Sequence, residues 1–232
     1  MNPSAIEIFK DFTALFFPNY CLACNDTLVK GEEIVCTKCI SEMPQNDHHL
    51  DHENSLRTRL AFRIPIVYGM AFFKFVKNSR VQHLLHSLKY KNHPEIGVML
   101  GKVYGNRLID AGFSSKFDLI IPIPLHESRR RKRGYNQSTK FAEGLAQKLN
   151  IPFSETVLER VVNTPTQTRK TKLNRWQNVS EVFVLKDNHT ILRKHILLVD
   201  DVITTGATVE ACGQILLKNG CDKLSIACLA EA

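Results

Sequence analysis

The feature that most constrains the fold of this chain is the stretch covering residues 195–208. Four consecutive apolar residues at 196–199 are typical of a strand that is buried on both faces of a sheet. Two carboxylates, Asp200 and Asp201, follow directly, and a turn of small residues and an apolar helical pattern come next. This order predicts polar groups at the carboxyl end of a parallel strand, where open α/β sheets bind their ligands.

The turn after the carboxylates has the composition of an anion-binding loop. It consists of Thr204, Thr205, Gly206, Ala207 and Thr208. Its backbone N–H groups and the N-terminus of the following helix suit a phosphate, because both present positive charge. The carboxylates suit sugar hydroxyls or a hydrated Mg²⁺, since both need negatively charged oxygen partners. The stretch predicts a phospho-sugar site, and the alternative is an ordinary strand–turn–helix unit with exposed acids.

A second constraint is a pair of Cys-x-x-Cys motifs near the N-terminus. The cysteines are Cys21, Cys24, Cys36 and Cys39, with eleven residues between the two motifs. Two tight turns at this separation can supply four thiolates to one tetrahedral Zn²⁺. Four cysteines leave no coordination position for water or substrate, so we expect a structural zinc ribbon. Two disulfides in a secreted module and a redox Cys-x-x-Cys are the alternatives.

The length and composition of the chain are those of a globular protein. Its 232 residues, 44% hydrophobic and 23% charged, can form one α/β domain and a small appendage. No apolar run approaches the roughly 20 residues of a membrane span. Glu7, Lys10 and Asp11 interrupt the apolar residues at the N-terminus, so we expect no secretory signal and a cytoplasmic location. The net charge of +8 favours anionic partners such as phosphorylated sugars, pyrophosphate, nucleotides or nucleic acid.

These patterns divide the chain into four expected parts. They are an amphipathic helix within residues 1–17, the zinc ribbon over 18–44, a linker over 45–61 and the main domain over 62–232. The linker segment is rich in Asn, Asp, His and Glu and has few periodic apolar residues. We interpret its histidines, His48, His49 and His52, as part of a solvated polar segment rather than as metal ligands.

Within the main domain, runs of apolar and β-branched residues predict strands, and apolar stripes at helical spacing predict helices. The predicted strands cover about residues 64–75, 117–123, 156–162, 182–185, 196–199 and 224–229, and the predicted helices cover about residues 79–90, 94–112, 136–149 and 207–218. Strands that alternate with helices imply a mostly parallel sheet with right-handed crossovers. We therefore expect an α/β fold, with a mostly parallel sheet flanked by helices.

A second candidate ligand loop follows the strand predicted at 117–123. It consists of Pro122, Ile123, Pro124 and Leu125, in which the prolines end strand pairing and stiffen the backbone. A basic run comes next, made of Arg129, Arg130, Arg131, Lys132 and Arg133 and ending at Gly134. Five consecutive cations do not occur inside a core. We interpret the run as a mobile basic arm that closes over a polyphosphate or contacts nucleic acid, and the alternative is a solvated basic loop.

Five local patterns together resemble the ComF family, in which an N-terminal four-cysteine zinc ribbon precedes a phosphoribosyltransferase-like domain. The patterns are Cys21/Cys24/Cys36/Cys39; Leu88-Lys89-Tyr90; residues 122–126 with Arg129, followed by Arg133-Gly134-Tyr135-Asn136-Gln137; Gln167 with Arg175 and Asn178 before Phe183; and residues 199–208. The last pattern resembles the phosphoribosyl-pyrophosphate (PRPP) motif of type I phosphoribosyltransferases. Together the patterns span most of the chain.

The resemblance implies a role for each matching position. Asp200 and Asp201 are expected to hold the ribose 2′ and 3′ hydroxyls, and the loop from Thr204 to Thr208 is expected to wrap the 5′-phosphate. The loop at Pro122, Ile123, Pro124 and Leu125 matches the position at which such enzymes hold pyrophosphate. Arg129 and Arg133, with Gly134, fall in a flexible segment that closes over the substrate. Mg²⁺ is expected with PRPP, to neutralise the pyrophosphate.

Two functions follow as hypotheses. The first is a Mg²⁺-dependent phosphoribosyltransferase whose acceptor is not specified by any motif in the chain. The second is a non-catalytic module that keeps this fold and binds single-stranded DNA through its basic runs. The resemblance implies a part in DNA uptake during natural transformation for either one.

Overall fold

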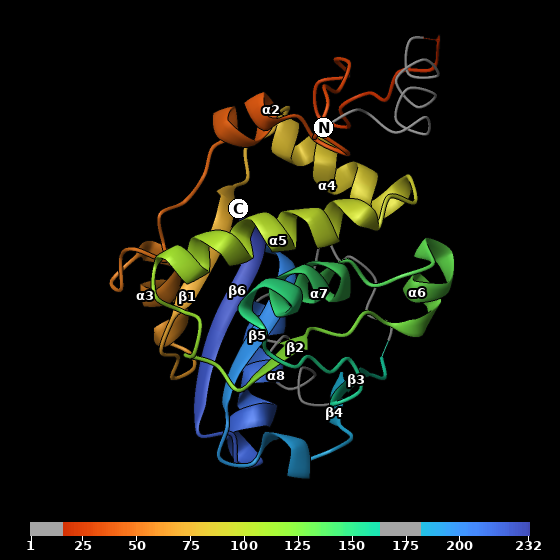
Figure 1. Cartoon of the computed structure of the whole chain (residues 1–232). Helices are drawn as coiled ribbons and strands as arrows, with labels where there is room; N and C mark the ends of the chain where they lie inside the picture. The colour runs from red at the N-terminus through yellow and green to blue at the C-terminus, as the bar shows by residue number, and fades with distance from the viewer. Residues whose placement is uncertain (1–15, 163–181) are drawn as a thin grey trace.

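The computed structural model describes residues 16–162 and 182–232 (Figure 1). The helix expected within residues 1–17 lies outside the described residues except at its last two positions. Gln167, Arg175 and Asn178, which belong to one of the family patterns, also lie outside them. Within the described part of the chain, none of the helices combines the length and hydrophobicity needed to cross a membrane.

Four parallel strands form the central sheet, in the order β1 (Gly69–Lys74), β6 (Lys223–Glu231), β5 (His195–Ile203) and β2 (Leu119–Pro122). Residues 196–199 of β5 are fully buried, as their continuous apolar run predicts. Because all four strands point the same way, their carboxyl ends meet at one edge of the sheet. The expected α/β fold is confirmed (Figure 1).

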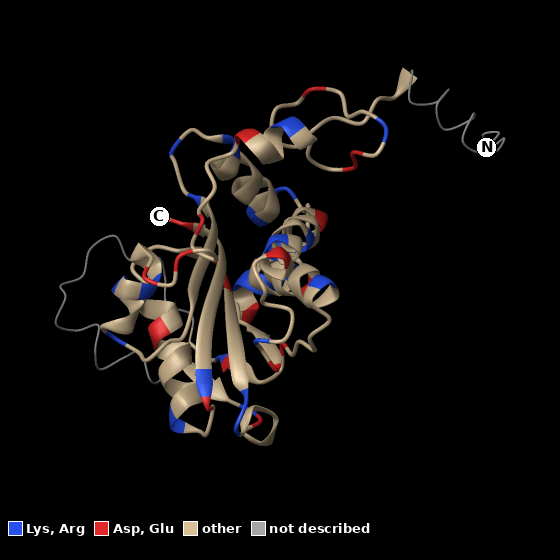
Figure 2. Ribbon diagram, turned by 60° about the vertical axis from the view of Figure 1, so that its left-hand side comes forward, with Lys and Arg blue, Asp and Glu red and all other residues tan. Residues whose placement is uncertain are grey.

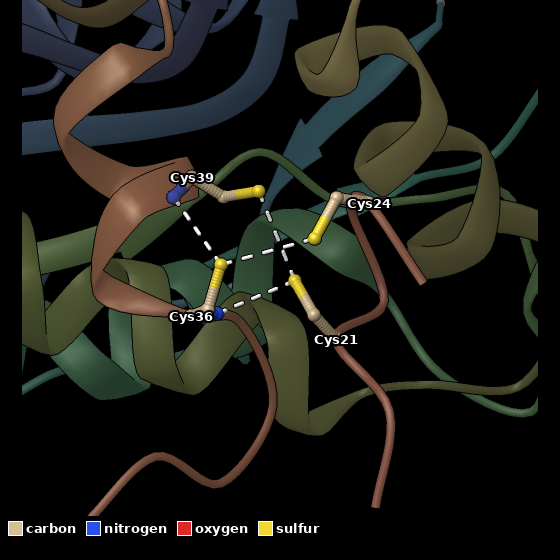
Figure 3. Close-up of side chains that lie close together, drawn as sticks. All are labelled: Cys21, Cys24, Cys36 and Cys39. Carbon is tan, nitrogen blue, oxygen red and sulfur yellow. Dashed lines mark hydrogen bonds between the residues drawn. The ribbon is translucent and has the colours of Figure 1, made fainter. Parts of the chain in front are cut away.

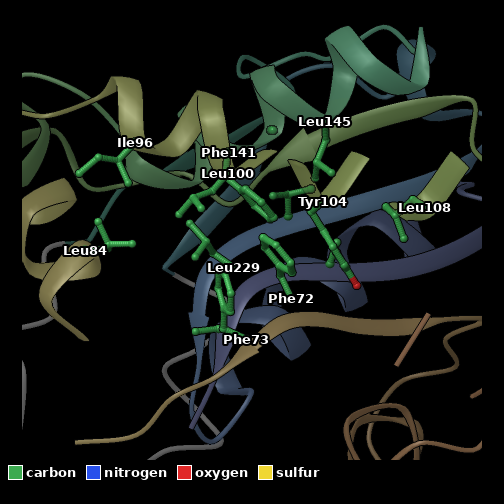
Figure 4. Packing of buried hydrophobic residues seen from close by; sticks show 14 of the residues in the cluster. Phe72, Phe73, Leu84, Ile96, Leu100, Tyr104, Leu108, Phe141, Leu145 and Leu229 are labelled. Carbon is green, nitrogen blue, oxygen red and sulfur yellow. The ribbon is translucent and has the colours of Figure 1, made fainter. Parts of the chain in front are cut away.

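Helices cover both faces of this sheet (Figure 2). On one face lie α5 (Glu95–Asp110) and α7 (Gln137–Leu149), with α4 (Arg80–Tyr90) packed on α5. On the other face lie α3 (Ser55–Ala61) and α8 (Ala207–Lys218). Each layer buries its own apolar cluster against the sheet, and Figure 4 shows the aromatic centre of the first one around Tyr104.

The contact between α5 and α7 is close enough to require glycine. A Cβ atom on Gly101 would lie 2.4 Å from the carbonyl oxygen of Phe141, and one on Gly144 would lie 2.2 Å from that of Val98. The two backbones therefore touch directly, and their register fixes where α7 begins above the carboxyl end of β5. That start matters because α7 contributes to the site described below.

Two predicted helices in this half of the chain begin at capping side chains. Ser79 caps α4 by accepting a hydrogen bond from the Gln82 N–H, and Asn136 caps α7 by accepting one from the Ser138 N–H. The helices predicted at about residues 94–112 and 207–218 are also present, as α5 and α8.

The structure differs from the solvated linker expected over residues 45–61. Helix α3 occupies the second half of that segment, capped by Asn54, and Leu56 and Leu60 are fully buried. Two leucines four residues apart lie on one helix face, which is enough to anchor a helix this short. His48 and His49 are half-buried, and burial lowers the pKa of both imidazoles below the usual value.

Three further differences concern short elements. Strand β1 begins at Gly69, several residues later than the apolar run begins. Strands β3 (Leu158–Arg160) and β4 (Phe183–Leu185) pair with each other as an antiparallel ribbon, outside the main sheet. The basic run lies in a helix, α6 (Glu127–Arg133), rather than in a loop. The remaining elements are α2 (Thr37–Glu42) and the 3₁₀ helix η2 (His189–Ile191).

Candidate functional site

The two adjacent carboxylates lie near the carboxyl end of β5, and both are partly buried. A carboxylate oxygen of Asp200, Oδ1, accepts a hydrogen bond of 3.0 Å from the Ser138 hydroxyl in the first turn of α7. The same oxygen accepts one of 2.8 Å from the Asp201 backbone N–H. Helix α7 therefore holds Asp200 in a fixed orientation.

Asp201 has a different partner. Its Oδ2 atom lies 3.0 Å from the Lys89 ammonium, which comes from the last turn of α4. Both side chains are mostly shielded, with 15% of Asp201 and 22% of Lys89 exposed, so this pair is less screened than a surface ion pair. Three elements distant in the sequence, α4, α7 and β5, thus converge on the carboxylates.

The environment of Asp200 favours its protonated form. Burial, followed by the neighbouring charge of Asp201, raises the pKa of Asp200 to about 7. The hydrogen bond from Ser138 and the positive charge of Lys89 act in the opposite direction. The protonation state of this carboxyl therefore changes near neutral pH.

The turn behind the carboxylates depends on Gly206. This residue has φ of +80° at the N-terminus of α8, and a Cβ atom there would lie 2.6 Å from Cδ2 of Leu60. The guanidinium of Arg63 donates a hydrogen bond of 2.6 Å to the Thr205 carbonyl oxygen and lies 3.6 Å from a Glu210 carboxylate oxygen. Helix α3 and the residues directly after it therefore shape the loop.

Most of the loop's backbone amides are left without a partner in the described part of the chain. Within residues 16–162 and 182–232, the backbone N–H groups of Thr204, Thr205, Gly206 and Thr208 donate no hydrogen bond. Thr204 and Thr205 are exposed. Amides of this kind, placed at a helix N-terminus, are suited to the oxygens of a phosphate.

The proline loop lies beside the carboxylates because β2 pairs with β5. Pro122 is in register with Val199, and the Ile123 N–H donates a hydrogen bond of 2.8 Å to the Val199 carbonyl oxygen. Pro122 and Ile123 are buried, whereas Pro124 and Leu125 are half-exposed and line a cavity of about 570 Å³. The two predicted ligand loops are therefore neighbours at the same edge of the sheet.

The cavity next to the proline loop carries both signs of charge. It is bounded by α6 and by the β3–β4 ribbon, with Arg130, Arg131, Arg160 and Lys186 facing Glu127, Glu155 and Glu159. Lys186 lies 3.1 Å from Glu159 and Arg130 lies 3.8 Å from Glu155. Neither Asp200 nor Asp201 lines this cavity, so the cavity lies beside the carboxylate site and does not contain it.

The basic arm is ordered as α6 and ends at Gly134, which has φ of +80°. Its residues are not buried, in agreement with the expectation for five consecutive cations. Arg133 donates a hydrogen bond of 2.7 Å to Gln137, and its guanidinium carbon lies 5.2 Å from the ring centroid of Tyr90. The arm therefore contacts both α7 and the end of α4.

The four N-terminal cysteines converge, as their spacing predicts (Figure 3). All four sulfur atoms lie within 4.8 Å of one another, and the Cys21–Cys39 and Cys24–Cys36 sulfur pairs are each 3.9 Å apart. A disulfide needs about 2.05 Å, whereas a tetrahedral zinc ion with Zn–S bonds of about 2.3 Å separates its sulfurs by about 3.8 Å. The arrangement fits four-thiolate zinc.

Backbone amides support this cluster. The N–H groups of Ala23 and Cys36 point at the Cys21 sulfur, at 3.4 and 3.3 Å, and the Cys39 N–H points at the Cys36 sulfur at 3.3 Å. Such contacts stabilise negative charge on thiolates. With four sulfurs around one point there is no room for a substrate, so the cluster is suited to a structural metal.

The cysteine module is docked on the main domain. Cys21, Cys39 and Met43 belong to the same apolar cluster as α4 and α5. Arg80, in the first turn of α4, lies 2.6 Å from Glu42 at the end of α2. Helix α4 therefore contacts the cysteine module at its beginning and the carboxylate site, through Lys89, at its end.

Sequence reasoning missed two residues of the carboxylate site. Ser138 follows the Asn136 cap but belongs to none of the recognised patterns, and Arg63 carries no local signal at all. Lys89 belongs to a family pattern, Leu88-Lys89-Tyr90, but nothing in its neighbourhood predicts a contact with Asp201. The contacts of all three are made across more than 60 positions of the chain, which no local pattern can report.

The C-terminal part of the chain matches a known family. Residues 136–232 match the family model described as a phosphoribosyl transferase domain. This match covers α7, the β3–β4 ribbon, β5, α8 and β6, and hence both Ser138 and the two carboxylates.

Three curated proteins extend the similarity. The DNA utilization protein YhgH of Salmonella typhi is 32% identical over 151 residues, covering 64% of this chain and 66% of that protein, just under two thirds of its length. Competence protein F of Haemophilus influenzae is 27% identical over 232 residues, covering 94% and 99% of the two chains. Competence protein ComFC of Bacillus subtilis is 26% identical over 201 residues, covering 86% and 78%. With its four-cysteine module joined to a phosphoribosyltransferase-type α/β domain, the chain belongs to the ComF family.

Proposed function

We propose that the carboxyl edge of the sheet binds PRPP together with Mg²⁺. One observation carries the proposal. Two adjacent carboxylates are followed, two residues later, by a loop at a helix N-terminus, and most backbone amides of this loop have no hydrogen-bond partner within residues 16–162 and 182–232. The loop suits a phosphate and the carboxylates suit a vicinal diol, and a ribose 5-phosphate carries both groups.

The described contacts suggest a role for each part. Asp200 and Asp201 hold the ribose hydroxyls, and residues 204–208 hold the 5′-phosphate. Pro122, Ile123, Pro124 and Leu125 face the pyrophosphate, beside Arg129, Arg133 and Gly134. Magnesium supplies neutralisation of the pyrophosphate charge when it is bound. Ser138, Lys89 and Arg63 are positioning residues, since each one holds a group that would touch the ligand.

We infer that the reaction class is phosphoribosyl transfer. The acceptor atom forms a bond to C1 of the ribose while the bond from C1 to the pyrophosphate oxygen breaks, through an oxocarbenium-like state. The residues around the site contribute by aligning the sugar and by screening C1 from water. The four cysteines hold a structural zinc in this proposal and take no part in the transfer.

The test is calorimetric titration of PRPP with Mg²⁺ into three proteins. The wild type should bind, and the Asp200→Asn/Asp201→Asn double variant should bind about 100-fold more weakly, because two charge-assisted contacts are lost. The matched control is Asp110→Asn/Asp222→Asn, which removes the same two charges at exposed positions. Equal affinity in the wild type and the first double variant would overturn the site assignment.

A second candidate function is a non-catalytic DNA-binding module. It is favoured by the exposed cations of α6 and by the printed names of the relatives, which refer to DNA utilization and competence. The two candidates are separated by pyrophosphate release from PRPP across a panel of bases and amines. Release with any acceptor supports transfer, whereas PRPP binding without release, together with salt-sensitive binding of single-stranded DNA, supports the module. A part in DNA uptake is compatible with both.

A further inference from the structure

The basic run is divided into two faces once it becomes a helix. Residues three and four positions apart lie on the same side of a helix. Arg129, Lys132 and Arg133 therefore share one side of α6, and Glu127, Arg130 and Arg131 share the other. Each side lines a different cavity. The side with Glu127 lines the cavity of about 570 Å³ beside the proline loop, and the side with Arg129 lines a second cavity.

The two cavities differ in charge. In the larger one the cations of α6 face glutamates, and Arg131 forms an ion pair of 2.6 Å with Glu127. The other cavity measures about 480 Å³ and is lined by residues from α6 and from the end of α4. Its lining residues are Lys89, Tyr90, Asn92, Arg129, Lys132, Arg133 and Gly134. Four of these seven are cations and, within the described part of the chain, none is acidic, so this cavity attracts anions.

An aromatic ring lies among these cations. Tyr90 is 62% exposed although it is a large side chain at the end of a helix that is otherwise well packed. The Arg133 guanidinium lies 5.2 Å from its ring centroid, and the His86 ring lies 4.9 Å from it. An exposed ring beside an arginine guanidinium is an arrangement on which proteins stack the flat base of a nucleotide.

The pocket adjoins the carboxylate site. Lys89 forms part of its wall, and the same ammonium lies 3.0 Å from Oδ2 of Asp201. A ligand in the pocket would therefore be separated from the carboxylates by a single side chain.

We propose that this pocket binds a nucleotide unit. The phosphate contacts the cations from α4 and α6, and the base stacks on Tyr90. A free nucleotide and the end of a single strand share this chemistry, and a cavity of about 480 Å³ is within the range of small-ligand sites. The pocket shares Arg129, Arg133 and Gly134 with the residues proposed to lie beside the pyrophosphate. Nucleotide binding can be measured without PRPP, and the meaning of the pocket as the place of a second substrate rests on the proposed function.

The test uses two substitutions outside the residues assigned to PRPP. Thymidine 5′-monophosphate and a short 5′-phosphorylated oligothymidylate are titrated into the wild type, Tyr90→Leu and Lys132→Gln. We expect about tenfold weaker binding for Tyr90→Leu, which loses the stacking surface. Lys132→Gln should weaken binding and reduce its salt dependence, since one phosphate contact is lost. Lys148→Gln, an exposed lysine on α7, is the matched control and should bind as the wild type does.

The comparison of the two probes identifies the source of the nucleotide. Equal affinity for the monophosphate and the oligonucleotide indicates a free nucleotide, and much tighter binding of the oligonucleotide indicates a strand end. The proposal is overturned if Tyr90→Leu binds both probes as tightly as the wild type does. PRPP titration into the same proteins keeps the two ideas distinct: nucleotide binding without PRPP binding in the wild type contradicts the proposed function alone.

Discussion

The ammonium of Lys89 lies 3.0 Å from Oδ2 of Asp201, although the two residues belong to α4 and β5 and are far apart in the sequence. The pair joins a helix that is in contact with the cysteine module to the strand that carries both carboxylates. The positive charge also acts on the neighbouring carboxyl, since it opposes the rise in the pKa of Asp200. Lys89 therefore has structural and electrostatic consequences that can be measured separately.

Replacing this lysine should destabilise the protein. Lys89→Met leaves the partly buried Asp201 without its cation, and we expect the free energy of unfolding at pH 7 to fall by about 1–2 kcal/mol. Urea unfolding measures the change, with Lys148→Met as the control. The double variant Lys89→Met/Asp201→Asn removes the uncompensated charge and should recover part of the loss. A double variant no more stable than Lys89→Met would show that the pair does not stabilise the fold.

The raised pKa of Asp200 predicts a specific dependence of stability on pH. In the unfolded chain the carboxyl titrates near 3.8, whereas in the folded protein it titrates at about 7. The folded state therefore binds more protons between these values, so its stability is greatest below the unfolded pKa and is lost as pH rises through the folded pKa. The free energy of unfolding of the wild type, measured relative to Asp200→Asn, should fall between about pH 4 and pH 7 and then level off. If the difference in unfolding free energy between the wild type and Asp200→Asn is constant over this range, the pKa of Asp200 is not raised in the folded protein.

The cysteine cluster predicts a zinc requirement. Cys39→Ser should lower the zinc content from about one ion per chain to nearly none, because the remaining three thiolates cannot complete the tetrahedron. Its melting temperature should fall by several degrees, since Cys39 and Met43 are part of the core that α4 shares. Atomic absorption and thermal unfolding provide the two readouts. Cys221→Ser, a buried thiol whose sulfur lies 3.1 Å from the Lys223 carbonyl oxygen, should keep its zinc.

The contact between α5 and α7 predicts that alanine is harmful where helix propensity alone favours it. Gly144→Ala should gain about 1 kcal/mol in propensity, yet its Cβ meets the backbone of α5, which has no flexible atoms to move aside. We expect a net loss of about 1–3 kcal/mol in the free energy of unfolding. Gln147→Ala, on the exposed side of the same helix, should change it by less than about 0.5 kcal/mol. A variant Gly144→Ala as stable as Gln147→Ala would mean that the helices separate easily.

Local patterns predicted much of this architecture because the physics behind them is local. The buried strand at 196–199, the helices capped by Ser79 and Asn136 and the convergence of four cysteines all follow from neighbours within a few turns of chain. The same local pattern combined the carboxylates with the loop at 204–208, and the family resemblance added PRPP as the expected ligand. Each of these predictions depends on the residues of one short segment, so the segment alone contains most of the information that the prediction needs.

Other features required the tertiary structure. Residues 45–61 contain too few apolar residues to predict a helix. Helix α3 is stable because Leu56 and Leu60 are buried against the sheet. Likewise, the environment of Asp200 depends on Ser138 and Lys89, which approach it from α7 and α4. Burial and through-space charge set its pKa, and neither quantity is written in a local pattern.

The chain by itself determined a parallel α/β fold, two candidate ligand loops, four cysteines with the spacing of metal ligands and a block of five cations. The tertiary structure decided how these groups face one another. It placed the two loops side by side through β2 and β5, attached Asp201 to Lys89, and turned the basic block into a helix with one acid-paired face and one face of cations beside Tyr90. The reason is physical: residue type fixes which interactions are available, whereas distance, burial and orientation fix which of them form.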